Sequence, residues 1–554
     1  MFHCDMNRIL PFALFLATTA PAFADTAYVN ANGYTIDDQG AVARFATLIV
    51  DDSGRVKATL PAGAPVAVKK KVDVGGKTMM PGLIDAHGHI MMLGELALRV
   101  DLNTTQSLGA AQAAIKAYKS QGPWILGGGW NQERWTSDGK AFGRFPTAAE
   151  LDAVTGSKPA YLERVDGHAA WVNTRALQLA GITAATPDPA GGRIERDASG
   201  APTGVLVDAA MDLVRAKIPP ATKAQADKAL TTALGIIASV GLTSVHDAGI
   251  DPEMWDRYRR FAAQGKLTTR VYAMAYGPQN RDNIAPQGPI KWDSGDHLAM
   301  MSMKLQADGA LGSRGAWMRA PYSDAPETRG LPFFEEGAFR RIILESSAKG
   351  FQTNVHAIGD AANGATIGAF AAVPEAQRKA LRHRDEHAQI VSTDDLIRFA
   401  RLGIIVSFQP THATSDKGMA EARVGEARLA GGYAWQTILR SGARIAAGSD
   451  FPVEPPNPFY GLHAAVTRQD RNGQPPGGWR ASEALTLPQA LAAFTTGAAY
   501  AAHAEDRMGS LTPGKWADFI IVDRDPFGIP AAELWQVGVE QTFVAGKPVF
   551  RKKR

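Results

Sequence analysis

Cysteine is almost absent from this chain. Its 554 residues include a single one, Cys4, near the N-terminus. One cysteine excludes an intramolecular disulfide, and its position leaves the rest of the chain without a thiolate metal site or a cysteine nucleophile. Any metal ion must therefore be held by histidine, aspartate, glutamate or a modified lysine.

Net charge of either sign is low as well. The formal net charge is +4 at pH 7, and the only basic block at the C-terminus is the tail FRKKR. This balance gives no support for a nucleic-acid or polyanion partner. We interpret the tail as a solvated terminus.

Long apolar runs are missing except at the N-terminus. Arg8 precedes the apolar stretch ILPFALFLATTA, and Ala22-Phe23-Ala24 follows it. A positive start, a short apolar stretch and a small-x-small site are typical of a signal peptide, and the stretch is shorter than the ~20 residues that span a bilayer. We predict a signal peptide over residues 1–24, secretion (in bacteria, to the periplasm) and no membrane contact in the mature form. Whether translation starts at Met1 or Met6 stays open.

Both ends of the mature chain resemble one β domain. Residues 25–80 and 507–554 contain short β-type segments separated by turn signals, such as RFATLIVDDSGRV and ADFIIVDRDP. Between them, apolar β-type runs alternate with helical patterns, which indicates βα units and a parallel sheet. We predict a small β-sandwich built from both chain ends around an α/β centre.

Eight β-type runs can be counted between residues 79 and 452, in the predicted barrel region of residues 81–506 and the two residues before it. They are MMPGLIDAHGH (79–89), GLTSVHDAG (241–249), TRVYAMAY (269–276), MSMKLQADG (301–309), FQTNVHAIGD (351–360), RDEHAQIV (384–391), GIIVSFQP (403–410) and RIAAGSDFP (444–452). Eight βα units close into a (β/α)8 TIM barrel. This is our predicted fold class, α/β.

The first two runs are much further apart than the others. The intervening chain includes the Trp- and Gly-rich pieces WILGGGWNQERW and AYLERVDGHAAWVNTRAL. We predict an inserted subdomain over about residues 95–215, placed after the first strand, on the face where such barrels have their active sites. Its tryptophans, Trp130, Trp135 and Trp171, fit an apolar substrate group and core packing equally well.

Ionisable side chains recur near the carboxyl ends of five of these runs. They are His87, His89, Lys304, His356, His387 and Asp450. A lone H-x-H is a weak signal, although residues two apart on a strand do point to the same side. The repetition at matching strand ends favours one shared site.

The chain resembles the amidohydrolase superfamily, in the branch called amidohydrolase family 3, which includes N-substituted formamide deformylases. The resemblance covers nearly all of the mature chain. It rests on the motifs PGLIDAHGH, GGGW, DGHAAWVNTRAL, GGRIERDASGAPTGVLVD, KLQADGALGSR, HAIGDAA, EHAQ, SFQPTH, GSDFPVEPPNP, AVTR and GSLTPGKWADFIIVD.

The resemblance implies a site with two metal ions. His87, His89 and Asp450 would bind the more buried ion, and His356 and His387 would bind the second. This ligand set suits zinc best, with iron, manganese and cobalt as further candidates. The resemblance also implies a small-molecule substrate and suggests a homodimer.

Lys304 would bridge the two ions after carboxylation of its amine. A lysine ammonium has no lone pair, but burial near cations lowers the pKa and allows the neutral amine to react with carbon dioxide. The alternative is a lysine that is ion-paired near Asp308, which would leave a single-metal site.

By the same resemblance, the metal ions would make hydroxide available near neutral pH, and Asp450 would orient the water and shuttle its proton to the leaving amine. The expected reaction is hydrolysis of a non-peptide C–N bond of the amide or formamide type. Ester, lactone or cyclic amide hydrolysis, deamination and a non-catalytic binding role remain alternatives. For Asp450 alone, the plain alternative is a helix N-cap.

Four further residues match family positions that could line the substrate pocket. They are Trp130, His168, Arg314 and His412. A purely structural role is the alternative for each of them.

Overall fold

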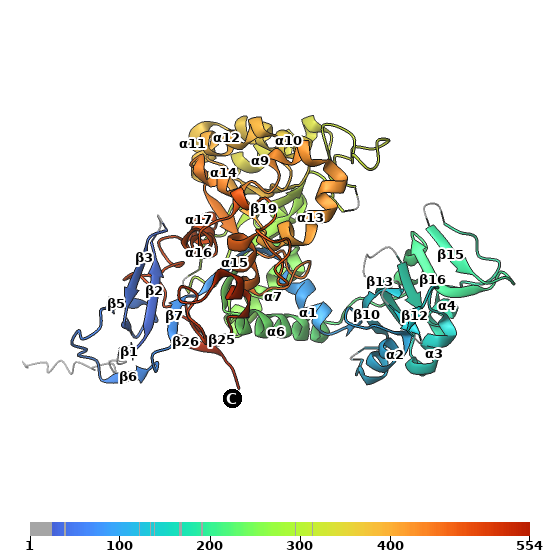
Figure 1. Cartoon of the computed structure of the whole chain (residues 1–554), viewed down its shortest axis with the longest axis horizontal. Coiled ribbons are helices and arrows are strands. Elements are labelled where there is room, and N and C mark those ends of the chain that lie inside the picture. The colour runs from blue at the N-terminus through green and yellow to red at the C-terminus, as the bar shows by residue number, and fades with distance from the viewer. Residues whose placement is uncertain are drawn as a thin grey trace, which may run out of the picture.

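An eight-stranded parallel sheet forms the centre of the molecule and closes into a barrel (Figure 1). The computed structural model describes residues 25–553 except 38–39, 121, 133–134, 138, 165–168, 190–191, 294 and 313, so the predicted signal peptide lies outside the described residues. The barrel strands are β8 (Leu83–Gly88), β17 (Leu242–Ile250), β18 (Arg270–Tyr276), β19 (Leu298–Gln306), β20 (Gln352–Ala357), β21 (Arg384–His387), β22 (Ile405–Phe408) and β23 (Ile445–Ala447). All eight overlap the runs expected from the sequence.

The strands follow one another around the barrel in chain order, from β8 through β17 to β23. The ring closes where the segment after β23 meets the end of β8, through a parallel bridge between Gly88 and Phe451. His89 N donates to Phe451 O at 2.8 Å, and Asp450 N donates to His87 O at 2.7 Å. The last strand end is therefore joined to the first.

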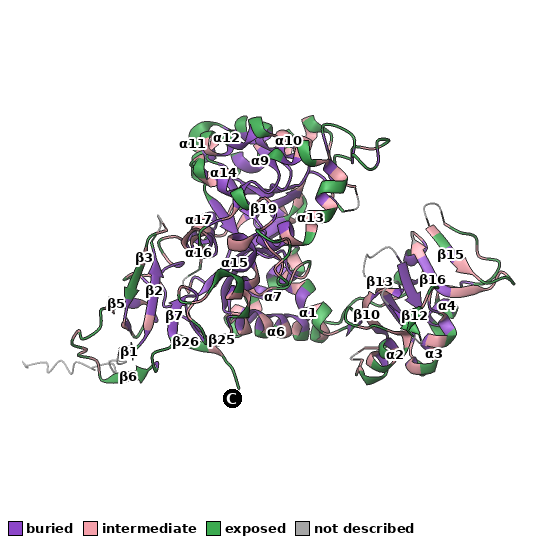
Figure 2. Cartoon of the chain, in the orientation of Figure 1, coloured by how far each residue is buried: buried purple, intermediate pink, exposed green. Residues whose placement is uncertain are grey.

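Helices surround the strands and leave the barrel wall buried, as the purple ribbons of Figure 2 show. They are α1 (Ile90–Ala97), α6 (Lys223–Ser239), α7 (Pro252–Ala263), α8 (Gly277–Ile284), α9 (Glu336–Ala348), α10 (Asp360–Ala371), α11 (Glu375–Leu381), α12 (Thr393–Leu402), α13 (Pro410–Val424), α14 (Trp435–Arg440), α15 (Pro458–Thr467), α16 (Leu487–Ala493) and α17 (Thr496–Ala501). None of the described helices has the length and hydropathy needed to cross a membrane.

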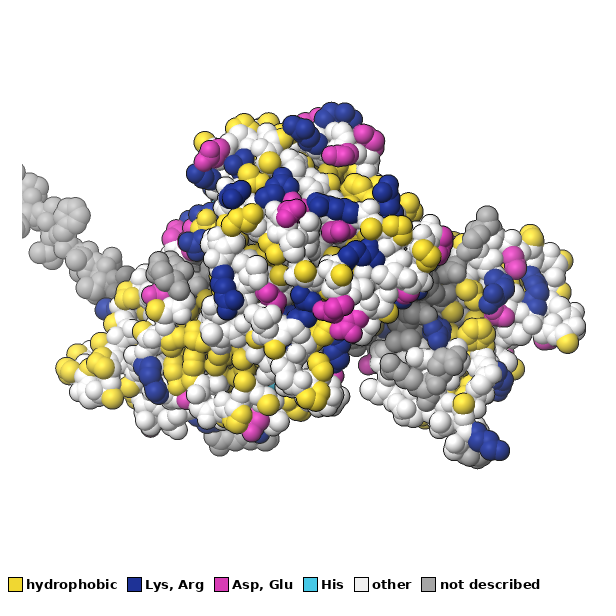
Figure 3. All heavy atoms as spheres, turned by 45° about the horizontal axis from the view of Figure 1, so that its top comes forward, with side chains coloured by type: hydrophobic (Ala, Val, Ile, Leu, Met, Phe, Trp, Pro, Cys, Tyr) yellow, Lys and Arg dark blue, Asp and Glu magenta, His cyan; other side chains and the backbone are white. Residues whose placement is uncertain are grey.

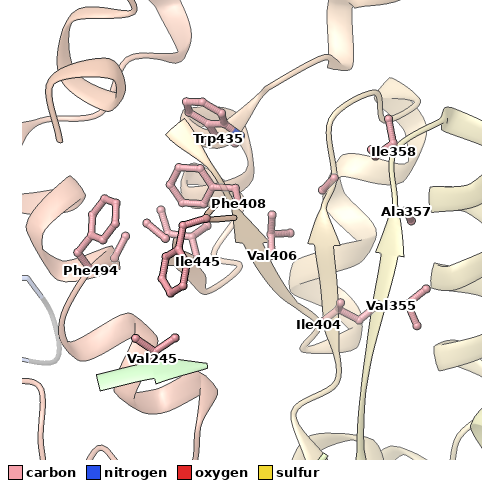
Figure 4. Close-up of a cluster of buried hydrophobic side chains, with 14 of the residues drawn as sticks. Val245, Val355, Ala357, Ile358, Ile404, Val406, Phe408, Trp435, Ile445 and Phe494 are labelled. Carbon is pink, nitrogen blue, oxygen red and sulfur yellow. The ribbon is translucent and has the colours of Figure 1, made fainter. Parts of the chain in front are cut away.

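β-branched and aromatic side chains fill the space between strands and helices. Figure 4 shows Val406, Phe408 and Ile445 from neighbouring strands gathered with Trp435 and Phe494 from the helical layer. Phe408 is fully buried, and its ring centroid lies 4.7 Å from that of Trp435. Burial on both faces explains why these strands read as continuous apolar runs in the sequence.

Both chain ends meet in a β-sandwich beside the barrel. Its strands are β1 (Thr26–Val29), β2 (Asn32–Ile36), β3 (Val42–Phe45), β4 (Thr47–Val50), β5 (Val56–Leu60), β6 (Lys70–Asp73), β7 (Thr78–Pro81), β24 (Phe519–Val522), β25 (Val539–Val544) and β26 (Lys547–Arg551). One sheet has the order β5-β4-β1-β6 and the other β26-β25-β24-β7-β2-β3. In the second sheet, C-terminal β24 pairs antiparallel with N-terminal β7.

A third unit is inserted between β8 and β17 and lies to one side of the barrel, on the right in Figure 1. Its elements are β9 (Val100–Asp101), α2 (Leu108–Ala117), β10 (Ile125–Trp130), β11 (Thr136–Ser137), β12 (Lys140–Ala141), α3 (Ala148–Thr155), β13 (Ala160–Arg164), β14 (Ala169–Val172), α4 (Thr174–Ala180), β15 (Gly192–Arg196), β16 (Pro202–Asp208) and α5 (Met211–Arg215). Six of the strands form a mixed sheet in the order β15-β16-β14-β13-β10-β9. The predicted fold class is confirmed.

The space-filling view shows the inserted unit as a separate lobe beside the main body (Figure 3). Over the main body, lysine and arginine side chains are interspersed with aspartate and glutamate side chains on the face shown. This mixture agrees with the low net charge of the sequence.

We expect Phe408→Ala to destabilise the barrel, because removing a buried phenylalanine costs about 3–5 kcal/mol of unfolding free energy. Calorimetry should show a lower apparent Tm. Phe333→Ala is the matched control, since Phe333 is 53% exposed and its removal should change stability by less than about 0.5 kcal/mol. Equal Tm shifts for both variants would contradict this description of the core.

Candidate active site

The six residues singled out as ligands converge at one end of the barrel, where the strands finish. His87 lies on β8, Lys304 on β19, His356 on β20, His387 on β21, and Asp450 follows β23, with His89 just before α1. His87, Lys304 and His387 are only 1%, 2% and 3% exposed. His89 is half-buried and places Nε2 3.2 Å from Asp450 Oδ1.

Three of these residues form a cluster that could hold a metal ion. His87, His387 and Asp450 each offer one ligand atom, and these atoms lie within 4.8 Å of one another. The cluster combines residues that the family resemblance assigns to two different ions, since His87 and Asp450 belong to the first and His387 to the second. The ring centroids of His356 and His387 lie 4.5 Å apart, so the second predicted pair borders the same cluster.

Two histidines are oriented by acceptors on their Nδ1 atoms. His87 Nδ1 lies 2.6 Å from Glu386 Oε2, and His387 Nδ1 lies 2.7 Å from Gln409 Oε1. Because a carboxylate and an amide oxygen can only accept, each Nδ1 donates and each Nε2 keeps its lone pair. This is the arrangement that metal-ligating histidines need.

Burial keeps these imidazoles neutral. Removal from water, with the charge of Lys304 adding to it, lowers the pKa of His87 to about 4 and that of His356 to about 3. Burial also lowers the pKa of His387 well below its usual value. Near pH 7 all three rings are therefore in the form that can ligate a metal ion.

Lys304 is buried against His87, with Nζ 3.0 Å from His87 Nε2. Burial lowers the pKa of its amine to about 8, so part of the population is uncharged near neutral pH. No carboxylate among the described residues lies within ion-pair distance of Nζ. The expected alternative partner, Asp308, instead accepts backbone N–H bonds from Trp317, Ile358 and Gly359.

Asp450 occupies strained backbone. Its φ is 61°, and the φ of His387 is 77°, both in the left-handed region that costs non-glycine residues about 1–3 kcal/mol. Although burial opposes ionisation, the hydrogen bond from His89 holds the pKa of Asp450 well below its usual range. The N-cap of the next helix, α15, is Asn457 rather than Asp450.

Glu386, Arg384 and Asp85 support the site. From the sequence, Asp85 is ambiguous between a partner of the ligands and a polar strand residue, and Glu386 and Arg384 have no expected role. Arg384 Nη2 donates to Glu386 Oε2 at 3.0 Å, so the acceptor of His87 is itself held in place. Asp85 accepts from His87 N at 3.0 Å and from Ser449 Oγ at 2.6 Å. Two sequence signals could have found two of these residues. Glu386 begins the motif EHAQ, and Asp85 precedes His87 by two positions in PGLIDAHGH, on the same side of the strand.

The four weaker candidates have different locations. Trp130 is fully buried in the core of the inserted sheet and donates from Nε1 to Leu162 O, so the structure does not bring it to the histidines. Arg314 pairs with Asp324 at 2.9 Å in the loop after β19. His412 lies beside Asp450, with Nε2 3.8 Å from Oδ2. His168 lies outside the described residues.

Next to the cluster, His89 lines a cavity of about 300 Å³. The cavity is bordered by Met91, Met92 and Met254 together with Asp247 at the end of β17. Both thioether and carboxylate groups therefore border the cavity beside His89.

Most of the chain also matches a known protein family. Residues 70–550 match the model described as the Amidohydrolase family. The chain belongs to this family. The Bacillus subtilis (strain 168) protein named "Putative amidohydrolase YtcJ" is 33% identical over 87% of this chain and 91% of its own length.

Two other comparisons extend across the chain. The N-substituted formamide deformylase of Arthrobacter pascens is 29% identical over 96% of this chain and 98% of its own length. The crystal structure of an uncharacterized metal-dependent hydrolase from Pyrococcus horikoshii OT3 superposes with a TM-score of 0.76 at 28% identity, covering 92% of this chain and 99% of that one. Membership of the family and the His/His/Asp cluster fit a hydrolase with a divalent metal ion.

The residues present suit such an ion. Nε2 of His356 is buried, and within the described part of the chain it has no hydrogen-bond partner. A buried imidazole nitrogen without a partner is costly, and a cation shared with the nearby Nε2 atoms of His87 and His387 is a suitable partner.

We expect Glu386→Gln to weaken metal binding by about 10–100-fold, because the acceptor that orients His87 loses its charge. Titration of the apoprotein with zinc would measure this change. Glu375→Gln, at an exposed position paired with Lys379, is the control and should bind as the wild type does. Unchanged affinity in Glu386→Gln would exclude this orienting role.

Proposed function

We propose that the chain is a metal-dependent amidohydrolase that cleaves a non-peptide C–N bond of the amide or formamide type. The observation that carries the proposal is a cluster of three groups: the neutral imidazoles of His87 and His387, each with a lone pair on Nε2, and the ionised carboxylate of Asp450. The similarity to an N-substituted formamide deformylase over 96% of the chain supports the choice of bond.

In this proposal His87, His89 and Asp450 would hold one ion, and His356 and His387 would hold a second. Zinc is the proposed metal, because nitrogen and carboxylate donors suit it. Bound there, the metal would lower the pKa of water to about 7 and polarise the scissile carbonyl.

Lys304 completes the ligand set after reacting with carbon dioxide. Its neutral amine attacks the carbon and forms a C–N bond, and one proton leaves to solvent, which converts the amine to a carbamate. The carbamate is anionic and offers two oxygen donors. The lowered pKa of Lys304 and the lack of a carboxylate partner among the described residues favour this step.

Asp450 acts as the proton carrier. Its carboxylate accepts a proton from the attacking water and delivers it to the leaving nitrogen, while the C–N bond breaks and the acyl carbon keeps the new C–O bond. One amide and one water thus give one carboxylic acid and one amine. His89 Nε2 lies 3.2 Å from Asp450 Oδ1, so both groups face the position where the ion would bind.

Metal removal is the direct test. The native protein is treated with a chelator, assayed against a panel of N-substituted formamides, amides, carbamates, esters and lactones, and then supplied again with zinc. We expect C–N hydrolysis to be lost and restored with metal content. Hydrolysis that is indifferent to chelation, or confined to the esters and lactones, would refute the proposal.

Asp450→Asn should lower kcat by about 10²–10⁴-fold, because the amide cannot accept the proton. The fold, followed by circular dichroism, should stay intact. Asp212→Asn, an exposed site with 68% side-chain exposure on α5, serves as the control. An Asp450→Asn rate close to that of the wild type would remove the proton carrier from the mechanism.

A further inference from the structure

His412 lies at the edge of the cluster, and its surroundings differ from those of the other histidines. It is the third residue of α13 and is only 8% exposed. Its ring stacks on that of His387 at 6.0 Å. Within the described residues its Nε2 has no hydrogen-bond partner, and Asp450 Oδ2, at 3.8 Å, is beyond hydrogen-bond reach.

The partner of the other ring nitrogen is a donor. Gln389 Nε2 lies 3.3 Å from His412 Nδ1 and 3.1 Å from Asp416 Oδ2. Since the carboxylate of Asp416 accepts, the amide NH2 group of Gln389 faces both residues and gives one hydrogen to each. Nδ1 of His412 is therefore an acceptor, and in the neutral ring the proton sits on Nε2.

Two further bonds hold this orientation of Gln389. Tyr433 OH donates to Asp416 Oδ2 at 2.9 Å, and Tyr433 N donates to Gln389 O at 2.7 Å. Gln389 and Tyr433 are both buried. The amide is thus fixed at its backbone and at its side chain, and it cannot rotate without breaking a buried contact.

The result is the opposite tautomer to that of the neighbouring rings. His87 and His387 donate from Nδ1 and keep a lone pair on Nε2, whereas His412 accepts at Nδ1 and presents an N–H group. An N–H group cannot ligate a metal ion. A buried donor without a partner is costly, so a ligand that brings an acceptor is favoured there.

We propose that His412 is a catalytic hydrogen-bond donor, and that its Nε2–H binds the carbonyl oxygen of the scissile amide as that oxygen gains negative charge. Gln389, Asp416 and Tyr433 are positioning residues that act through His412. This proposal rests on the proposed hydrolytic function. It extends that function by assigning the oxyanion a donor from the protein.

His412→Phe keeps a flat ring and removes the donor. We expect kcat on the best substrate of the panel to fall by about 10²–10³-fold, as on removal of an oxyanion donor, with KM changed far less. Zinc content should equal that of the wild type. His412→Gln, whose amide can place an N–H near the position of Nε2, should recover part of the loss.

Gln389→Met tests the positioning residue with a side chain of similar length that cannot donate. We expect kcat to fall by about 10-fold with KM nearly unchanged, and the double variant Gln389→Met/His412→Phe to be no slower than His412→Phe alone. Additive losses would show that Gln389 acts independently of His412.

A spectroscopic measurement separates this proposal from the proposed function. In ¹⁵N-histidine-labelled protein, the signals lost in His412→Phe identify this ring, and their shifts report which nitrogen carries the proton. We expect the Nε2–H tautomer. The Nδ1–H tautomer, a loss of zinc in His412→Phe or an unchanged kcat would each overturn the proposal. If the wild type hydrolyses none of the substrates, the proposed function fails, and with it the catalytic role of His412. A measured Nε2–H tautomer would then support only the assignment of Nε2 as a hydrogen-bond donor.

Discussion

Closure of the barrel is the constraint on which the site depends. The segment after β23 must lie directly against the end of β8, and the carboxylate of Asp85 joins them by accepting from Ser449 and from His87 N. Two glycines make room for this contact. A Cβ on Gly448 would lie 2.5 Å from His87 N, and a Cβ on Gly88 would lie 2.5 Å from the Phe451 ring. The same backbone contact places Asp450 beside the first histidine pair.

A charged network under the site stabilises the ligand geometry. Arg384 donates to Glu386, to Ser407 Oγ at 3.0 Å and to Ala86 O at 2.6 Å, and contacts His246 Nδ1 at 2.9 Å. A buried ion pair compensates its desolvation only when its remaining donors are satisfied, and most of those of Arg384 are. The network therefore fixes Glu386 at the distance that holds the proton of His87 on Nδ1. The buried charges of Arg384 and Glu386 thus orient the neutral ring of His87 without touching the reacting atoms.

Much of the architecture could be predicted from the sequence, because a barrel strand buried on both faces leaves a continuous apolar run. MMPGLIDAHGH and RIAAGSDFP are such runs, and the polar residues at their ends point to the site. The tautomers could not be predicted. Glu386 orients His87 across the barrel from 299 residues away, and Gln409 orients His387 from the end of the neighbouring strand. Neither pair leaves a local pattern in the sequence. The tryptophans of the insert, such as Trp130, were ambiguous because packing and ligand binding favour the same residue type.

The sheet shared by the two chain ends also bears on the order in which the protein can fold. β7 leads directly into the first barrel strand, yet its partner β24 is made more than four hundred residues later in the chain. Until β24 is synthesised, β7 presents one edge with unpaired backbone groups, which is a site for pairing with other chains. Contacts of such long sequence separation form slowly. β7, which leads into the barrel, therefore needs protection from aggregation until β24 has been synthesised and pairs with it.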